Sequence, residues 1–343
     1  MSSSESHSGK NQTISDVFIL VGFSYLGELQ ILLFLLLLLT YLVALMGNLF
    51  IILLIKLSPS LHTPMYFFLV NLSVLEICFT TSVVPQLLVH LLVEEKTISL
   101  VACAAQMYVF TIMGLTECCL LAGMAYDRYV AICRPRLCVR LAGASWGIGI
   151  LAEVAETTWL FSLPFCGSNR IHHYFCDVRP LEKMACADTW KNVIVGLPVL
   201  LLFILGPFLL IFLSYIRIIS TILRLPSADG KRKAFSTCSS HLTVVTLFYG
   251  TGLFIYLKPT SSSTPESDQL ISLMYTVVTP VLNPIIYTLR NKEVKGAFRN
   301  TVGKAIFSHS QRNERKRKRV NGNSVSFHVL LTIHGVSRCP EEL

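Results

Sequence analysis

The chain has 343 residues, of which 53% are hydrophobic and only 14% are charged, and its formal net charge is +9. Because an ordinary soluble domain has about a quarter charged residues, this composition argues against a soluble protein and predicts a membrane protein. The positive charge could suggest nucleic acid, but no groove pattern of aromatic and basic residues accompanies it, so no nucleic-acid partner is expected.

The first 28 residues are polar, and we expect residues 1–28 to form an extracellular segment. They contain no short apolar core with a small-residue cleavage site, so no removable signal peptide is expected. Asn11 begins the pattern Asn-Gln-Thr, an acceptor for N-glycosylation. The same pattern at Asn71 lies inside an apolar stretch and cannot be used.

Seven stretches are apolar over the roughly 20 residues that a membrane-spanning helix needs. They cover residues 29–55, 63–93, 99–133, 141–163, 192–216 with a further turn, 234–257 and 269–289. The fourth is the least clear, because Glu153 and Glu156 lie inside it. The sequence therefore predicts an all-α membrane protein with seven transmembrane helices over residues 29–305 and a short amphipathic helix after the seventh.

The lysine and arginine residues predict the orientation of these spans. An odd number of spans places the two ends on opposite faces, and most basic residues gather on one face. They are Lys56, Arg134, Arg136, Arg140, Arg217, Arg224, Lys231, Arg232, Lys233, Arg290, Lys292, Lys295, Arg299 and Lys304. We expect this face to be cytoplasmic, so the N-terminus of a multi-pass plasma-membrane protein would be extracellular.

Two acids lie at membrane depth, Glu76 in the second span and Glu117 in the third. Two facing carboxylates cannot both stay ionised in a low dielectric without a cation, which predicts a shared proton or a bound sodium ion. The alternative, in which each is protonated separately and bonded to backbone, stays equally open. Asn48 and Asn283 add polar groups to the inner half of the bundle.

Asp127 and Arg128 end the third span. From residue 99 to residue 126 a helix covers roughly 40 Å, more than the hydrocarbon thickness of about 30 Å, so the pair emerges at the cytoplasmic surface. An isolated pair of this kind would be an ordinary interfacial ion pair. In the seventh span Pro284 frees a backbone carbonyl and kinks the helix, either as a mechanical joint or as a static bend.

Several short motifs follow one another along the chain. They are Gly47-Asn48, LHTPMYFFLVNLS (61–73), MAYDRYVAIC (124–133), Ser214-Tyr215, KAFSTCSSHL (233–242) and PVLNPIIYTLRN (280–291). In this order and spacing they resemble the olfactory receptors, a group within the rhodopsin-like G-protein-coupled receptors. The resemblance covers residues 15–305 and implies a receptor, not an enzyme, that a volatile odorant activates and that raises cyclic AMP through a stimulatory G protein.

The resemblance also implies roles for single residues. Arg128, held by Asp127 at rest and followed by Tyr129, would meet the G protein. The switch that rearranges on activation would comprise Tyr215, Asn283, Pro284 and Tyr287. Glu76 and Glu117 match the acidic positions thought to bind sodium or a proton, and no other cofactor is expected.

The resemblance implies two disulfides on the extracellular side, Cys103 with Cys176 and Cys166 with Cys186. Four cysteines allow three pairings, so the sequence alone does not fix these bonds. The bonds would hold the second extracellular loop over the mouth of the bundle as a lid.

A volatile odorant is small and mostly apolar, so its site should be an enclosed apolar pocket with a few polar groups. The outer halves of the third, fifth, sixth and seventh helices would supply its lining, with one deeper residue in the sixth. The candidates are Met107, Phe110, Thr111, Gly114, Phe203, Tyr249, Leu253, Tyr256, Leu273 and Thr276. The hydroxyls of Thr111, Tyr256 and Thr276 could orient a ligand, whereas for the apolar members plain helix packing is the alternative.

Three features depart from the resemblance. The segment RPRLC (134–138) makes the second cytoplasmic loop more basic, and Glu153 and Glu156 are not expected in the fourth helix. The tail, residues 306–343, contains RNERKRKR (312–319), which we expect to be disordered and drawn to anionic membrane lipid.

Two other functions were weighed. A non-odorant receptor of the same superfamily is the nearer alternative. A small transporter or channel could use four glutamates inside the spans as a polar pathway, namely Glu76, Glu117, Glu153 and Glu156. That function predicts internal repeats or paired broken helices, and the sequence has neither.

Overall fold

The computed structural model describes residues 17–130, 135–165, 168–186, 194, 196–224, 226–257, 264–290 and 293–301, almost all of them helical. Several predicted features lie outside these residues or their described side chains. They are the glycosylation site at Asn11, Cys166, the tail 306–343 and the side chains of Arg128, Tyr129 and Tyr256.

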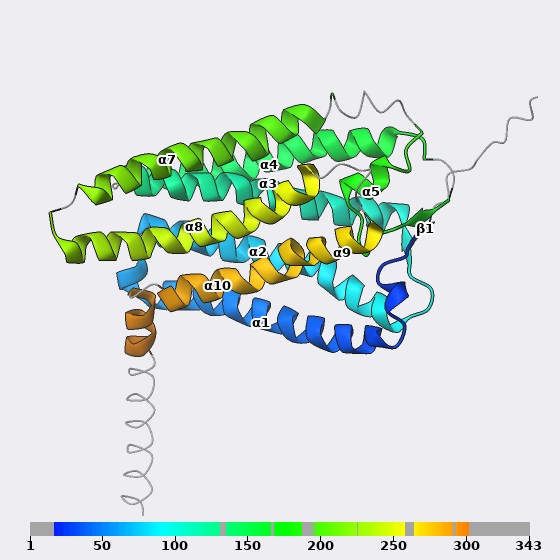
Figure 1. Cartoon of the computed structure of the whole chain (residues 1–343), viewed down its shortest axis with the longest axis horizontal. Helices are drawn as coiled ribbons and strands as arrows, with labels where there is room; N and C mark the ends of the chain where they lie inside the picture. Colours follow the sequence, from blue (N-terminus) through cyan, green and yellow to red (C-terminus); the bar gives the residue numbers. More distant parts are fainter. Residues whose placement is uncertain are drawn as a thin grey trace, which may run out of the picture.

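Long helices running along one axis form the molecule, as Figure 1 shows. The first four are α1 (Leu29–Leu57), α2 (Pro64–Leu92), α3 (Leu100–Val130) and α4 (Pro135–Ser162). The fifth joins η3 (Leu200–Leu205) to α7 (Gly206–Leu223), the sixth is α8 (Ala228–Leu257), and the seventh joins α9 (Pro265–Leu273), η5 (Met274–Val278) and α10 (Thr279–Arg290). The seven predicted spans are therefore present.

Six of these helices are long and apolar enough to cross a membrane, counting the described residues only. The remaining long helix, α8, packs against α7 and α10 and completes the bundle. Their outer faces are apolar as well: Leu32 in α1 is 65% exposed and Leu151 in α4 is 74% exposed. A helix that is apolar all round is buried in protein or in lipid, so these faces fit a multi-pass membrane protein.

Several helices extend beyond the predicted apolar stretches. The fourth begins at Pro135 rather than residue 141, and the sixth begins at Ala228 rather than residue 234. A helix does not have to end where the hydrocarbon ends, because water can solvate its polar side chains once it leaves the bilayer. Apolar length therefore marks the span, not the helix.

The short helix predicted after the seventh is present over residues 293–301. Val294 and Ala297 are buried on one face, and neighbouring positions are exposed. The Tyr66 hydroxyl donates a hydrogen bond to Glu293 Oε2 at 2.9 Å, which ties this helix to α2.

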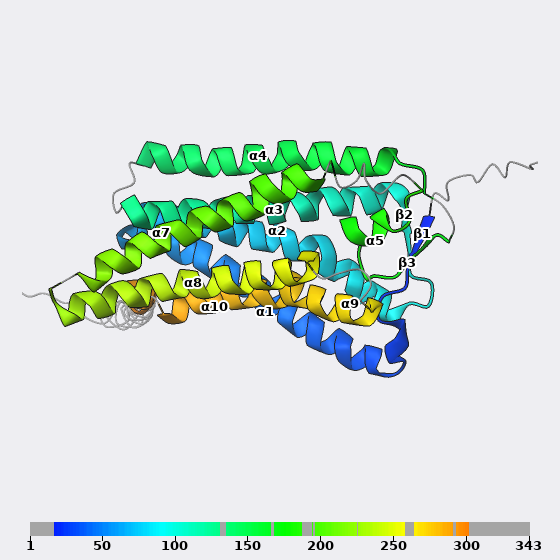
Figure 2. The same cartoon turned by 45° about the horizontal axis from the view of Figure 1, so that its top comes forward.

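A small sheet closes the end of the bundle that the sequence predicts to be extracellular. β1 (Val17–Leu20) pairs antiparallel with β2 (Thr97–Ser99) and parallel with β3 (Arg170–Ile171). After β3 the chain enters the short helix α5 (Val178–Glu182), which lies over the mouth of the bundle in Figure 2. The other short turns are η1 (Ser24–Leu26) and η2 (Pro59–Leu61).

The predicted bond between Cys103 and Cys176 is present, with the two Cα atoms 5.5 Å apart, and it anchors the second extracellular loop to the outer end of α3. Cys186 is also disulfide-bonded. Its predicted partner, Cys166, lies outside the described residues. The lid-like position of this loop thus has a covalent anchor.

Candidate functional site

A cavity of about 100 Å³, here called the aromatic pocket, lies between α3, η3, α8 and η5. Its lining is almost wholly apolar and includes five aromatic side chains. The lining residues are Phe79, Phe110, Thr111, Gly114, Leu115, Cys118, Ile204, Phe248, Tyr249, Gly252, Leu253 and Tyr275. An enclosed apolar cavity with few polar groups is the usual form of a small-molecule site.

Phe110 holds the outer wall of the aromatic pocket together. Its ring centroid lies 4.6 Å from that of Phe79, 4.7 Å from that of Phe175 and 6.0 Å from that of Tyr275. These contacts join α2, α3, the second extracellular loop and η5. Aromatic pairs at these separations stabilise packing beyond simple burial, so the wall is preformed.

Three hydroxyls border the aromatic pocket, and two of them are engaged. Tyr249 donates to the carbonyl of Cys118 at 3.4 Å, and Tyr275 donates to Ser272 Oγ at 3.2 Å. Thr111 Oγ1 is buried and has no hydrogen-bond partner among the residues that the structure describes. A buried hydroxyl without a partner is costly, so Thr111 is the polar group that a ligand could satisfy.

The structure places the predicted ligand residues in different surroundings. Phe110, Thr111, Gly114, Tyr249 and Leu253 line the aromatic pocket. Two candidates pack elsewhere: Met107 lies in an apolar cluster with Cys103, and Leu273 lies in the main apolar core. The Thr276 hydroxyl is hydrogen-bonded to Tyr174 of the loop, and Phe203 lines a separate cavity.

Some residues that line the aromatic pocket were not predicted from the sequence. Gly114 and Cys118 follow Phe110 at intervals of four, and this helical spacing could have pointed to Cys118. No such signal was available on the fifth helix, where Ile204 rather than Phe203 lines the pocket. Because η3 is π-helical, a turn there holds more residues than an α-helical turn, which displaces the pocket-facing position.

The second extracellular loop descends into the bundle and covers the aromatic pocket. The Tyr174 and Thr276 hydroxyls share a hydrogen bond of 2.9 Å, and His173 Nε2 lies 3.2 Å from Ser272 Oγ. The Cys176 amide donates to Gln106 Oε1 at 2.9 Å. These bonds fix the loop to α3 and to the seventh helix.

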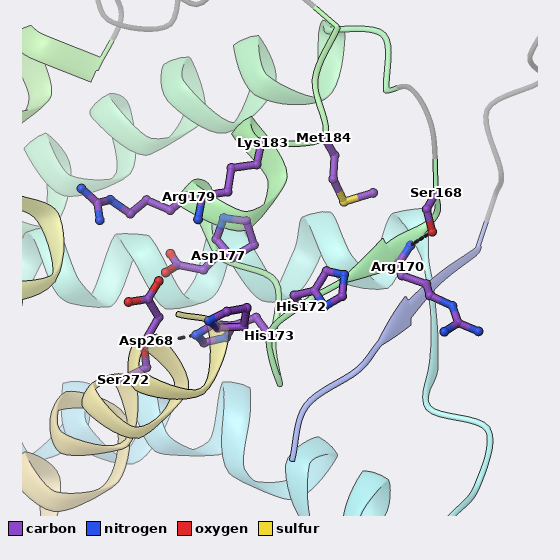
Figure 3. A pocket seen from close by; sticks show the side chains of 12 residues that line it. Ser168, Arg170, His172, His173, Asp177, Arg179, Lys183, Met184, Asp268 and Ser272 are labelled. Carbon is purple, nitrogen blue, oxygen red and sulfur yellow. Dashed lines mark hydrogen bonds between the residues drawn. The ribbon is translucent and has the colours of Figure 1, made fainter. Parts of the chain in front are cut away.

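Above this lid lies an outer pocket of about 310 Å³ with a charged lining. In Figure 3 His173 reaches Ser272, while Arg170 and Arg179 extend to opposite sides. Burial, opposed by a backbone hydrogen bond at Phe175 and helped by the charge of Lys183, lowers the pKa of His173 to about 3. Burial raises the pKa of Asp177 to about 6, although Val178 N–H and Arg179 oppose this.

A buried polar layer lies between α1, α2, α3 and α10. Asn283 Nδ2 donates to Glu76 Oε1, and Asn48 Nδ2 donates to the carbonyls of Ala44 at 3.0 Å and Pro280 at 3.3 Å. Glu117 is 2% exposed and lies within the electrostatic reach of Glu76. The structure therefore brings together the two acids and two amides that the sequence singled out.

Two carboxylate oxygens of this layer, and also the amide oxygen of Asn283, lack a hydrogen-bond partner in the described part of the chain. Within the described ranges, Glu76 Oε2 and Glu117 Oε1 are buried and have no hydrogen-bond partner. A shared proton or a monovalent cation would satisfy both atoms, so the donor set fits either.

Near the opposite end of the bundle, which the sequence predicts to be cytoplasmic, Tyr215 of α7 contacts α8. Its hydroxyl lies 2.8 Å from His241 Nδ1 and 3.4 Å from the carbonyl of Cys238. His241 is fully buried and was not among the predicted residues, although it lies in the KAFSTCSSHL motif. Pro284 lies inside α10 as predicted, and Tyr287 is buried one turn further along.

The chain forms a bundle of seven long helices with a loop-capped pocket and a buried polar layer, which is the architecture of a seven-helix membrane protein. The fold is similar to that of squid rhodopsin, with a TM-score of 0.58 over 78% of this chain and 83% of that one. Because the two sequences are only 17% identical, this match concerns the fold alone.

The family follows from sequence comparison. The family model described as olfactory receptor matches residues 37–305. Human olfactory receptor 10A4 is 53% identical over 309 residues, covering 87% of this chain and 98% of the relative. Mouse olfactory receptor 5G29 is 50% identical over 313 residues, with the same coverage of 87% and 98%. The chain belongs to the olfactory receptor family.

Proposed function

We propose that this protein is an odorant receptor of the plasma membrane, with its N-terminus outside, and that it activates a stimulatory G protein to raise cyclic AMP. The aromatic pocket carries this proposal, because it is apolar, lies between the helices and is covered by the disulfide-anchored loop. Membership of the olfactory receptor family supports an odorant as the ligand and a receptor rather than an enzyme.

The size of the aromatic pocket limits the ligand. An apolar cavity of roughly 150 Å³ accommodates benzene, and the volume here is about 100 Å³. A ligand about the size of one ring therefore fits only if the side chains that line the pocket move slightly apart. Its apolar body packs against Phe110 and Tyr275, and one oxygen accepts or donates a hydrogen bond at Thr111.

Ligand contact is transmitted through α8. Tyr249 lines the aromatic pocket and also bonds to α3, so a ligand that displaces its ring changes the contact between the two helices. Further along α8, His241 contacts Tyr215. An odorant that binds the rearranged helices more tightly shifts the population toward them and opens a cytoplasmic cavity around Arg128.

We further propose that Glu76 and Glu117 hold a sodium ion or one shared proton in the resting state. The two orphaned carboxylate oxygens support this, and the bound cation would neutralise the acids and stabilise the resting arrangement. If sodium is the occupant, replacing it with choline should raise basal cyclic AMP in membranes. Unchanged basal activity would leave the proton as the occupant. Glu117→Gln is the second test: glutamine imitates a protonated acid, so basal activity should rise if sodium is the occupant and stay near the wild-type level if a proton is.

The coupling proposal is tested by measuring odorant-evoked cyclic AMP in cells that express Arg128→Ala. We expect the signal to be lost while the receptor remains at the cell surface. Arg224→Ala, at the exposed end of α7, is the control and should retain it. An undiminished signal from Arg128→Ala would show that this arginine has no role in coupling.

A further inference from the structure

A further cavity, separate from the aromatic pocket and the outer pocket, opens on the lipid-facing side of the bundle between α4 and the fifth helix. It has a volume of about 440 Å³ and is here called the membrane-facing cavity. Its lining consists of Ile148, Leu151, Ala152, Ala155, Glu156, Pro198, Val199 and Phe203. Figure 2 shows α4 at the edge of the bundle, and Ile148 and Leu151 are exposed on the span.

Glu156 is the one ionisable residue in this lining. The structure shows no hydrogen bond or ion pair for it within the residues described. A carboxylate in an otherwise apolar membrane site is costly without a partner of opposite charge. The polarity of the cavity therefore comes from a single unsatisfied acid.

The neighbouring charges increase the demand for a cation. The side chains whose charges act on Glu156 are Glu182 and Asp177, both acidic, and Glu156 in turn acts on Glu153. Glu153 is fully buried, and one of its oxygens accepts a hydrogen bond from the Thr157 hydroxyl. Arg179 offsets part of the charge of Asp177 and Glu182, whereas among the described residues only acids act on Glu156 itself.

The depth of Glu156 suits an amphiphile. Six residues separate it from Ser162 at the extracellular end of α4, which corresponds to about 9 Å along the helix. An ammonium group at the level of the lipid headgroups could reach it, while an alkyl chain lies against Leu151 and Phe203.

We propose that the membrane-facing cavity is a second binding site, distinct from the aromatic pocket, for small amphiphilic amines that partition into the outer leaflet. The protonated nitrogen pairs with Glu156, and the apolar chain occupies the groove between α4 and η3. Charge complementarity selects an amine over a neutral or anionic amphiphile. Ile204 lines the aromatic pocket and the adjacent Phe203 lines this cavity, so occupancy acts on the wall that separates the two sites.

The test uses the full chain in nanodiscs of neutral phosphatidylcholine. A photoreactive octylamine analogue is crosslinked to the receptor, and the labelled peptides are mapped by mass spectrometry. Labelling should fall on residues 148–156 and 198–203, and octylamine should compete at roughly tenfold lower concentration than octanol, as expected for a hydrogen bond to a charged group.

Glu156→Gln should abolish this preference, whereas Glu266→Gln, an exposed acid at the start of α9 on the same side, should keep it. Ala155→Phe keeps the acid but fills the cavity from a lipid-exposed position, so labelling should be lost without loss of folding. Equal competition by octanol, labelling elsewhere, or full labelling of either Glu156→Gln or Ala155→Phe would overturn the proposal. Odorant signalling does not enter these readouts, so the outcome is independent of the proposed function.

Discussion

Thr111 is the residue of the aromatic pocket whose hydroxyl is available to form a hydrogen bond with a ligand. Its hydroxyl is buried without a partner in the described part of the chain, whereas Thr276, an equally good candidate from sequence, is bonded to Tyr174. Sequence places both hydroxyls near the pocket, but only the fold of the extracellular loop decides which one is free for a ligand.

Thr111→Val keeps the shape of this side chain and removes its hydroxyl. We expect roughly tenfold weaker activation by odorants that carry a hydroxyl or carbonyl, because one hydrogen bond is lost. Pure hydrocarbons of similar size should be unaffected, and Thr111→Ser should retain the response. Dose–response curves of cyclic AMP would measure this, and an unchanged response to oxygenated odorants would contradict it.

Asp177 and His173 give the extracellular loop an opposed pair of pH dependences. The pKa of Asp177 is raised from 3.8 to about 6, so the folded loop holds an extra proton and loses stability as pH rises through this window. The pKa of His173 is lowered from 6.5 to about 3, so the unfolded loop holds the extra proton and stability rises with pH.

Between about pH 4 and pH 6 the contributions of Asp177 and His173 to the pH dependence of stability should cancel. Asp177→Asn should leave the histidine effect alone, so stability would rise with pH by up to about 1.4 kcal/mol per unit. His173→Gln should leave the aspartate effect, and stability would fall with pH. Thermal unfolding of the purified receptor at several pH values would measure this, and slopes of the same sign in both variants would refute the assignment.

At the scale of elements, apolar stretches in the sequence predicted each of the seven long helices, and six of these are long and apolar enough to cross a membrane over the described residues. The π-helical segments η3 and η5 were not predicted, because nothing in their composition distinguishes them from α-helix. Each contributes a residue to the aromatic pocket, Ile204 and Tyr275. The pocket lining was therefore predictable on α3, where regular spacing holds, and not on the fifth helix.

Close contact between α3 and α4 depends on Gly149. A Cβ atom there would lie 2.5 Å from Thr116 Oγ1 and 3.3 Å from the Thr116 backbone nitrogen, so α4 would have to move away. Gly149→Ala should destabilise the receptor by about 1–3 kcal/mol. Gly147→Ala on the same helix meets nothing within 4 Å and should be neutral or slightly stabilising. Equal melting temperatures in detergent for the two variants would argue against this packing.

At the scale of the molecule, the long helices connect the capped aromatic pocket, the buried polar layer and the contact between Tyr215 and His241 near the other end of the bundle. The order of the motifs in the sequence was sufficient to predict the fold and the family, because each motif occupies a fixed place in the bundle. The pairing of Cys103 with Cys176 needed the structure, since sequence left three pairings open.

Two glycines of α8 test whether an odorant acts by occupying the aromatic pocket. Gly252 lines this pocket, whereas Gly250 is exposed on the outside of the same helix, and an added Cβ meets nothing within 4 Å at either position. Gly252→Leu should fill the pocket, and Gly250→Leu should not, while helix propensity changes equally.

The measurement is odorant-evoked cyclic AMP, normalised to receptor at the cell surface, for these two variants and the wild type. We predict that Gly252→Leu abolishes the response to odorants that activate the wild type and that Gly250→Leu preserves it. A full response from Gly252→Leu, at equal surface expression, would contradict the account.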